Sequence, residues 1–296
     1  MQKIIYVPPG GSLDDTSARA EFSLTPPYII GTVSGTGGAE TTILSSAVPG
    51  LPGAYLQGVR AESRVISFFI NVSGSDRKDM YENRFALVKL LTPRETPGTL
   101  YYTNDYKTLR IAAIPQTTPG FSERLENYNR AELSFWCPSP YFEELTEKTG
   151  QMAFLNEGFT FPFSFGVKGA AGYGVSFASV QKEVVLHNAG SVPTPIEVSI
   201  KGPANQPAIV NLTTGERVGL SHTLLEGETL QINTKKGEKK VLIQKTSGEE
   251  DAFHYIDPQS VFFELQPGDN LLKYESADET EPTQILVRYR ELYAGV

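Results

Sequence analysis

Three histidines and one cysteine are the residues of this chain best suited to metal binding or nucleophilic chemistry. His187, His222 and His254 stand far apart in the sequence, and none belongs to a recognisable metal-binding motif. Cys137 follows the only tryptophan, Trp136, and precedes a proline at the end of an apolar run, where a buried structural thiol is the expected state. These residues predict neither a metal site nor a reactive thiol.

The other residue types that carry chemistry also lack a local signature. No Gly-x-Ser-x-Gly turn presents a serine nucleophile, and the carboxylates at residues 143–144 and 249–251 have the pattern of solvent-exposed runs. The glycines of residues 35–38 are not followed by the Lys-Ser/Thr pair of a phosphate-binding loop, so they predict a flexible loop. We expect no catalytic residue, no cofactor site and no enzyme activity.

The charge balance argues against a surface that grips nucleic acid. Lysine and arginine number 26 against 34 aspartates and glutamates, which gives a formal net charge of −8. The one basic cluster, residues 235–240, surrounds a glycine between two apolar runs, which is typical of a hairpin tip rather than of a phosphate-binding patch. An acidic protein can still line a path of DNA, because it repels the duplex.

Length and composition favour two soluble domains built from short strands. A chain of 296 residues exceeds most single cores, and its 27 glycines and 20 prolines suit many turns. One cysteine cannot form an internal disulfide, which favours assembly in a reducing compartment. The N-terminus has too short an apolar run for a secretory signal, and no stretch approaches the roughly 20 apolar residues that span a bilayer.

The first block of the chain, residues 1–142, has the pattern of a strand-rich domain. Residues 64–72 are rich in β-branched and aromatic side chains, which favour strands. In residues 128–136 apolar and polar residues alternate, which predicts one buried and one wet face. Further strands are expected at residues 3–7, 21–24, 27–30, 53–57, 98–103 and 107–114.

One helix is expected in this block. Ser75 or Asp76 can accept hydrogen bonds from the free N–H groups of a first turn, and Thr92-Pro93 ends the pattern. Between these limits Met80 and Leu87 lie on one face of a helix, together with neighbouring apolar residues. Such a helix is expected to cover a sheet.

The junction between the two blocks is the stretch Phe-Trp-Cys-Pro-Ser-Pro-Tyr-Phe at residues 135–142. Because proline cannot donate a hydrogen bond to a strand ladder, Pro-x-Pro predicts the end of strand pairing. Residues 143–150, an acidic and helix-prone run, are then expected to be a linker. The predicted domains are residues 1–142 and residues 151–296.

The second block has the pattern of an antiparallel β-sandwich with no helix of any length. Turn residues recur about every ten residues between short apolar runs, which is typical of that architecture. Strands are expected at residues 159–167, 181–188, 194–201, 208–211, 228–233, 240–245, 261–265, 270–274 and 284–291.

Five short motifs follow one another along the chain. An aromatic strand with a Pro-Tyr-Phe element occupies residues 135–142, and a Phe-x-Asn-x-Gly turn occupies residues 154–158. A Pro-Ile pair opens the strand at residues 194–202, which ends in glycine. An Asn-x-Thr-Thr-Gly turn at residues 211–215 and a Leu-x-Pro-Gly-x-Asn turn at residues 265–270 complete the set. The set resembles the distal tail protein (Dit) family of bacteriophages with long, non-contractile tails, the siphophage tail component family.

The resemblance covers nearly the whole chain and implies a fold, an assembly and partners. It implies a mainly β protein, with an N-terminal β-sandwich-like ring domain that carries one α-helix and a C-terminal galectin-like antiparallel β-sandwich. Such proteins form hexameric rings at the tail tip, continue the tail tube, and dock the tail-associated hub or lysin protein and the receptor-binding or other baseplate proteins. We therefore expect a structural virion protein, assembled in the host cytoplasm, whose mildly negative lumen lets DNA pass.

Two stretches of the first block, residues 31–53 and residues 135–142, are expected to have special roles. The Gly-rich residues 31–53 are longer and looser than the resemblance suggests, so we expect an arm or belt that becomes ordered in the ring. Residues 135–142 are expected to be a hinge between the ring-forming domain and an outward-facing sandwich. Trp136 is then the expected packing anchor at the root of this hinge, with Cys137 buried beside it.

The alternative function is a carbohydrate-binding adhesion module that recognises the host cell wall. A galectin-like fold invites this interpretation, but the second block has no tryptophan to stack on a sugar ring. The pair His187-Asn188 also lacks the arginine and tryptophan partners of a galectin site. A wall-degrading hydrolase is the third hypothesis, and no residue pattern supports it.

Overall fold

The computed structural model describes residues 2–47, 49–50, 52–121, 128–153, 182–277 and 284–296. The chain forms two compact units. Unit 1 consists of Met1–Leu145 together with Leu292–Val296, and unit 2 is Thr146–Glu291. The chain therefore passes from one unit to the other twice. No helix in the described ranges is long and apolar enough to cross a bilayer.

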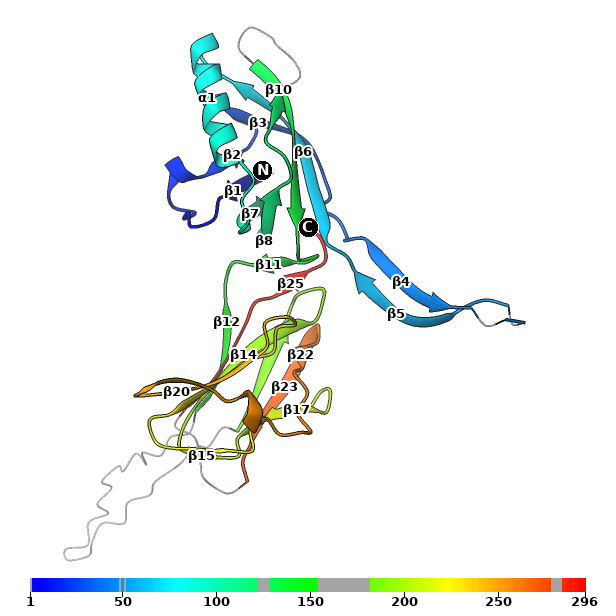
Figure 1. The fold of residues 1–296 in the computed structure, drawn as a ribbon, viewed down its shortest axis with the longest axis vertical. Helices are drawn as coiled ribbons and strands as arrows, with labels where there is room; N and C mark the ends of the chain where they lie inside the picture. Colours follow the sequence, from blue (N-terminus) through cyan, green and yellow to red (C-terminus); the bar gives the residue numbers. More distant parts are fainter. Residues whose placement is uncertain (1, 48, 51, 122–127, 154–181, 278–283) are drawn as a thin grey trace, which may run out of the picture. The chain divides into compact units, whose positions relative to one another are not determined.

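Unit 1 is built on an antiparallel sheet whose central path runs β2-β1-β7-β8-β10-β6-β3 (Figure 1). Two short strands, β9 and β25, and the strand β11 join it at its margins. The strands are β1 (Lys3–Val7), β2 (Ala20–Phe22), β3 (Tyr28–Ser34), β6 (Arg64–Ser73), β7 (Gly98–Thr103), β8 (Thr108–Pro115), β9 (Gly120–Phe121), β10 (Tyr128–Cys137), β11 (Phe142–Glu144) and β25 (Leu292–Tyr293).

The centre of unit 1 is the long pair β6 and β10. The two strands pair along their whole length, from Tyr128 opposite Ser73 to Cys137 opposite Arg64. Alternate side chains face the core, as the alternation in the sequence predicts, and Phe135 is fully buried there. Its ring lies 5.1 Å from that of Tyr6 and 5.8 Å from that of Phe68, between ring centroids.

The predicted helix is α1 (Arg77–Leu90). The Asp76 carboxylate accepts a hydrogen bond from the backbone N–H of Asp79 at 2.8 Å, which caps the first turn. Asp79 in turn accepts a hydrogen bond from the backbone N–H of Ser75, so the turn is closed from both directions. Met80 and Leu87 are buried where the helix packs against the sheet, and the prediction of a sheet-covering helix is confirmed.

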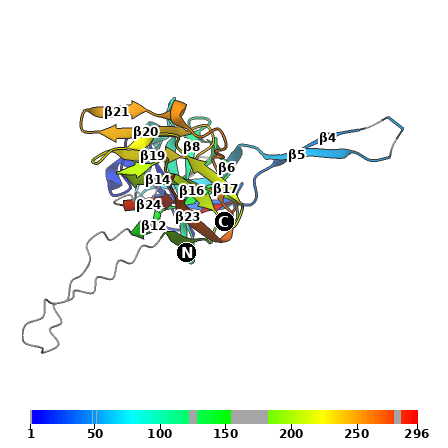
Figure 2. The same ribbon diagram turned by 90° about the horizontal axis from the view of Figure 1, so that it is seen from below.

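A hairpin of β4 (Thr41–Ser46) and β5 (Tyr55–Ala61) extends away from the rest of unit 1 (Figures 1 and 2). We call Thr41–Ala61 the arm. Its two strands pair with each other and, in the part of the chain that the structure describes, with no other strand. The expected strand at residues 53–57 is therefore present as part of β5, whereas its partner β4 was not predicted.

The predicted linker, residues 143–150, contains strand residues rather than a helix. β11 pairs with β8 and with β25, and the Arg110 side chain donates two hydrogen bonds to the Glu143 carboxylate at 3.1–3.2 Å. β12 (Lys148–Ala153) pairs along its whole length with β24 (Gln284–Tyr289) of unit 2. The helix-prone composition of these residues does not produce a helix, because tertiary strand pairing satisfies this backbone instead.

Unit 2 has the predicted character of an antiparallel sandwich. One sheet has the order β12-β24-β14-β19-β20-β21, and a second has the order β13-β23-β16-β17 (Figure 2). Its remaining strands are β13 (Glu183–Asn188), β14 (Thr194–Lys201), β15 (Ala204–Asn205), β16 (Ala208–Asn211), β17 (Glu216–Gly219), β18 (Thr223–Leu224), β19 (Thr229–Asn233), β20 (Lys240–Lys245), β21 (Gly248–Asp251), β22 (Glu264–Leu265) and β23 (Gly268–Glu275).

Most strand predictions in this block agree with the structure. β14, β16 and β20 have the predicted bounds, whereas the strand expected at residues 261–265 shrinks to the two residues of β22. The strand expected at residues 159–167 lies outside the described residues. Buried apolar side chains of both sheets form one core, so the two layers pack face to face.

The basic residues 235–240 lie at the turn between β19 and β20, as predicted for a hairpin tip. Gly237 has a φ of +83°, a backbone conformation that glycine adopts without strain. Lys236 pairs with Glu264 at 3.0 Å and Lys235 pairs with Glu238 at 2.9 Å. These carboxylates neutralise part of the cluster, which agrees with a hairpin tip rather than a phosphate-binding patch.

Candidate self-assembly surface

The three histidines of the sequence do not gather into one site. The Nδ1 atom of His187 lies 2.6 Å from the Asp269 carboxylate across β13 and β23. His222 and His254 both contact the Tyr255 ring, at centroid distances of 4.2 and 3.9 Å. Within the described ranges no group of three or more histidine, cysteine, aspartate or glutamate side chains is placed to hold a metal ion.

The carboxylate runs singled out in the sequence are engaged in local pairs. Glu143 pairs with Arg110, and Glu144 lies 3.6 Å from the Lys107 ammonium group. In the second run, Glu250 pairs with Lys245 at 2.5 Å on the hairpin of β20 and β21. Residues 249–251 are exposed or half-buried, as expected for a solvated run, whereas Glu143 and Glu144 are half-buried and pair with cations of the neighbouring strand β8 and its turn.

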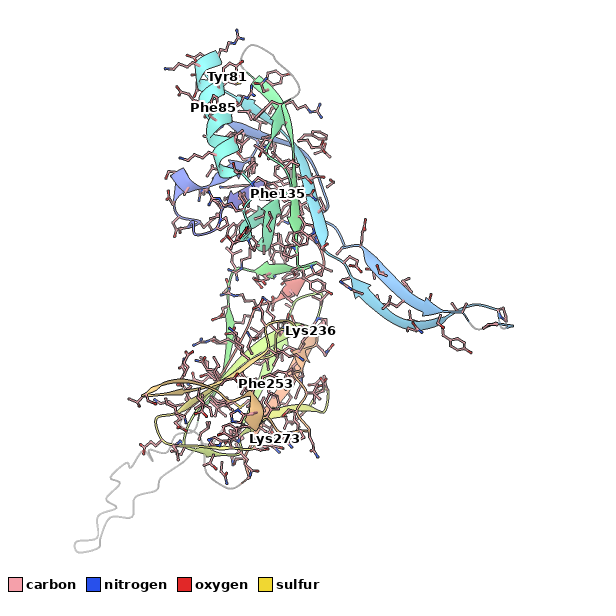
Figure 3. All side chains as sticks on the ribbon, in the orientation of Figure 1. Tyr81, Phe85, Phe135, Lys236, Phe253 and Lys273 are labelled. Atoms are coloured by element: carbon pink, nitrogen blue, oxygen red, sulfur yellow. The ribbon has the colours of Figure 1, made fainter. Side chains whose placement is uncertain are left out.

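Trp136 is not the buried packing anchor that the sequence predicted. Its side chain lies on the wet face of β10, is 39% exposed, and donates a hydrogen bond from Nε1 to the Ser63 hydroxyl at 3.1 Å. The neighbouring Phe135 takes the anchoring place, because successive residues of a strand face opposite sides of the sheet. Figure 3 shows Phe135 within unit 1, among the strands that surround it.

Cys137 is fully buried, as predicted, and shares its surroundings with a buried guanidinium group. Burial raises the pKa of the Cys137 thiol from its ordinary 9.0 to about 12, and the nearby positive charge of Arg64 opposes this shift only in part. Burial also lowers the pKa of Arg64. The thiol is held protonated, so it is unreactive in the folded chain.

The raised pKa of Cys137 predicts a loss of stability at alkaline pH. Between pH 9 and about 12 the unfolded chain releases the thiol proton and the folded chain keeps it, so rising pH favours unfolding. The stabilisation is complete below pH 9 and falls by up to about 1.4 kcal/mol per pH unit above it. Urea unfolding at pH 8 and pH 10.5 should show a loss about 2 kcal/mol larger in the natural chain than in Cys137→Ala. An equal pH dependence in the two proteins would contradict this assignment.

The arm exposes apolar side chains on both of its faces. Ile43 lies opposite Val59 and Ser45 lies opposite Leu56, so these pairs place three apolar side chains on one face. The other face carries Leu44 and Tyr55. All five apolar side chains are exposed, by 49–67% of their surface.

An arm of this kind is unlike an ordinary surface hairpin. A two-stranded hairpin without a third strand or a covering layer is marginally stable in water. Exposed strands with apolar side chains are also templates for association, and most proteins protect such edges with charge or coverage. In the arm only Arg60, which pairs with Glu62 at 3.5 Å, brings a charge among the strand residues. These properties are typical of a segment that is covered by a partner.

Unit 1 has a second exposed apolar surface on the outer face of β6 and β10. Val65, Phe69, Tyr128 and Trp136 are each exposed by 37–43% of their surface, and the Arg130 guanidinium lies 4.4 Å from the centre of the Phe69 ring. A hollow of about 260 Å³ opens beside Phe69, Tyr128 and Arg130, where β3 has a register shift. We call these residues the outer face.

The signal for these two surfaces in the sequence is weak. The expected arm at residues 31–53 overlaps β4, but it includes part of β3 and leaves out β5. The outer face follows from the alternation in residues 64–72, which puts Val65 and Phe69 on one side. Periodicity alone does not reveal that Val65 and Phe69 are exposed, because each side of β6 carries large apolar residues.

Comparisons with known families identify both halves of the chain. Residues 19–137 match the family described as phage tail protein RIFT-related domain. Residues 189–293 match the family described as siphovirus-type tail component, C-terminal domain. The two matches follow one another in the order expected for a single protein and together span about three quarters of the chain. No curated protein sequence matches the chain.

Solved structures with a similar fold include the Dit protein (gp 19.1) of phage SPP1, described as a paradigm of the hub adsorption apparatus in phages that infect Gram-positive hosts. The match covers 99% of each chain with a TM-score of 0.67 at 13% sequence identity, so it supports the fold. A component of the phage P2 baseplate in its activated conformation with calcium covers 98% of this chain and 97% of that chain, at 13% identity and a TM-score of 0.48.

The mainly β fold, with one helix in unit 1 and a galectin-like sandwich in unit 2, is therefore confirmed. The motif at residues 154–158 lies outside the described residues, whereas the other four lie within the described units. The two tail-component families describe structural parts of a phage tail, which confirms the expectation that the protein is not an enzyme. The chain belongs to the distal tail protein family of siphophages.

Proposed function

We propose that this tail protein forms a homohexameric ring at the tail tip. In this proposal the ring joins the tail tube to the tail-associated hub and receptor-binding proteins, and DNA passes through its lumen. Unit 1 makes the ring and unit 2 faces outward, where it docks other baseplate components. In this proposal the functional domains are the predicted residues 1–142 and 151–296, except that Leu292–Val296 belong to the first domain.

The arm is the observation that carries the ring proposal. A closed ring needs two different surfaces on each copy, because every subunit contacts one neighbour with each side. Unit 1 offers two exposed apolar surfaces in different elements, the arm and the outer face. The arm extends from unit 1 without pairing to another described strand, so it is suited to reach the next copy. Burial of its apolar residues there would stabilise the contact.

The charge of the chain supports a lumen through which DNA passes. The formal net charge of −8 is repeated in each copy of a ring, so the assembly repels the duplex rather than retaining it. The basic cluster at residues 235–240 belongs to unit 2 and is partly neutralised by Glu238 and Glu264. The single buried thiol agrees with folding in the reducing cytoplasm of the host, where the tail would be assembled.

Native mass spectrometry of the full chain tests this proposal. We expect a species of six chain masses at micromolar concentration, either alone or after addition of the tail tube protein. The second condition is included because a ring can close on its neighbour in the tail. A monomer in both conditions, or an open series of masses without a closed species, would contradict the ring.

A further inference from the structure

The root of the arm is held by one buried side chain, Arg64, the first residue of β6. Only 4% of Arg64 is exposed. Its guanidinium group donates hydrogen bonds to the backbone carbonyls of Gly35 and Gly37, which precede the arm, at 3.2 and 2.9 Å. The same group donates a short hydrogen bond to the carbonyl of Ala294, near the C-terminus of the chain. One side chain therefore joins the segment that enters the arm to the C-terminal residues.

The C-terminal residues make further contacts with this root. The backbone N–H of Val296 donates a hydrogen bond to the carbonyl of Thr36 at 3.0 Å. Gly295 lies so close to Gly37 that a Cβ atom at residue 295 would come within 2.8 Å of the Gly37 carbonyl carbon. We call Leu292–Val296 the tail. Its contacts lie on the segment between β3 and β4, which is the path into the arm.

The tail is itself fixed within unit 1 by the strand pair β11 and β25. Tyr293 lies opposite Phe142, and its hydroxyl accepts a hydrogen bond from the Lys107 ammonium group at 2.5 Å. The Phe142 ring lies 4.6 Å from the Arg64 guanidinium carbon, so Arg64 also rests on the strand that pairs with the tail. Arg64 and Phe142, which are buried, are thus connected to the half-buried tail at the base of the arm.

The backbone at Gly35, where the chain leaves β3 toward the arm, is closely packed against β6. Gly35 has a φ of +81°, and a Cβ atom there would lie 1.9 Å from the carbonyl oxygen of Val65. The chain thus turns directly against the start of β6 as it leaves β3. Because the arm has no described strand partner outside itself, the contacts at its root are the ones that set its direction.

We propose that the tail acts as a latch that orients the arm for its contact with the next copy. Arg64 is the positioning residue of this latch, since it binds the entry segment and the tail at the same time. When the tail is displaced, Arg64 loses one acceptor and the entry segment loses two contacts, so the arm pivots more freely about its root. The inference rests on the ring proposal for its consequence, but the latch itself is a property of the single chain.

When the tail is displaced, the arm should pivot more freely about its root while unit 1 stays folded. Gly295→Ala adds one methyl group against the Gly37 backbone, and deletion of residues 294–296 removes the contacts altogether while leaving β25 in place. Arg64→Lys keeps the positive charge and removes the forked geometry that reaches several carbonyls at once. Arg84→Lys is the matched control, because Arg84 of α1 bonds Asn129 at 3.2 Å in unit 1 but does not touch the root.

Hydrogen exchange of the monomeric full chain measures the latch directly. The amides of residues 35–46 and 55–64 are expected to exchange about tenfold faster in the three latch variants, and at unchanged rates in Arg84→Lys and throughout unit 2. Assembly measured on the same samples should require about tenfold more protein. Unchanged exchange at the arm root in Gly295→Ala and in the deletion variant would overturn the latch. Failure of the natural chain to assemble would instead overturn the ring, since the exchange result does not depend on it.

Discussion

Replacing both Ile43 and Val59 by aspartate is expected to abolish assembly of the full chain while leaving its fold intact. The two side chains lie opposite each other on one face of the arm and are exposed by 67% and 63%. Burying each of them against a neighbour is worth about 1.5 kcal/mol or more, and a buried unpaired carboxylate is unfavourable. Each contact should weaken at least about a hundredfold, and native mass spectrometry should then find the monomer.

A matched control separates the arm from any other exposed strand. Val185 of β13 in unit 2 is exposed by 60%, nearly as much as Val59, so Val185→Asp introduces one of the two added charges at a similarly exposed strand residue. We expect this variant to assemble like the natural chain. Circular dichroism melting should be nearly unchanged for both variants, because exposed substitutions usually alter stability by less than about 0.5 kcal/mol. Assembly of the double aspartate variant at the natural concentration would contradict the role of the arm.

Phe135→Ala is expected to lower the free energy of unfolding of unit 1 by about 3–5 kcal/mol. The side chain is fully buried between the rings of Tyr6 and Phe68, so its removal leaves a cavity lined by aromatic groups. Urea unfolding followed by tryptophan fluorescence measures unit 1 alone, because Trp136 is the only tryptophan in the chain. The urea midpoint of the fluorescence transition should fall sharply. A second transition, from the unfolding of unit 2, should remain visible by circular dichroism at its natural urea concentration.

Phe85 of α1 provides the control for this experiment. It is also a phenylalanine of unit 1, but it is exposed by 74%, and Figure 3 shows it on the helix, apart from Phe135. Phe85→Ala should change the free energy of unfolding by less than about 0.5 kcal/mol. A loss below about 1 kcal/mol in Phe135→Ala would mean that this side chain does not anchor the core. Trp136, the packing anchor expected from the sequence, is 39% exposed, so Trp136→Ala should lower the free energy of unfolding less than Phe135→Ala does.

The sequence was informative wherever one face of an element is buried. The alternation in β10 correctly separates its two faces, and the Asp76 cap with the Met80 and Leu87 positions correctly predicts α1. Turn chemistry placed β14, β16 and β20 within their bounds. Caps, turns and hydrophobic periodicity are properties of short stretches of sequence, so they can be recognised without knowledge of tertiary contacts.

The errors arose where tertiary structure decides. Trp136 is expected from the sequence to be the packing anchor at the root of the hinge, yet its parity in β10 puts it on the wet face beside Ser63. Residues 143–150 have helix-forming composition, but β8, β24 and β25 recruit them into strands. The return of the tail to unit 1 has no local signal, since residues 292–296 follow directly on the last strand of unit 2.

The family resemblance succeeded for a different reason than the strand predictions. Each turn motif alone occurs in many sandwiches, but their order along the chain is specific to one arrangement of strands. The functional expectation followed from that order, because no residue pattern in the sequence carries a catalytic or metal-binding signature. The expected arm at residues 31–53 overlaps β4 but leaves out β5, and the contacts of the tail have no counterpart in the sequence pattern, because both depend on which surfaces remain uncovered in three dimensions.

Electron cryo-microscopy of the assembled full chain tests the central claim most directly. The account predicts a closed ring of six copies in which unit 1 makes the contacts between neighbours. Each arm should lie on unit 1 of the adjacent copy, with Ile43 and Val59 covered, and unit 2 should stand outside the ring. A ring closed through unit 2, or one in which the arms remain free of any neighbour, would contradict it.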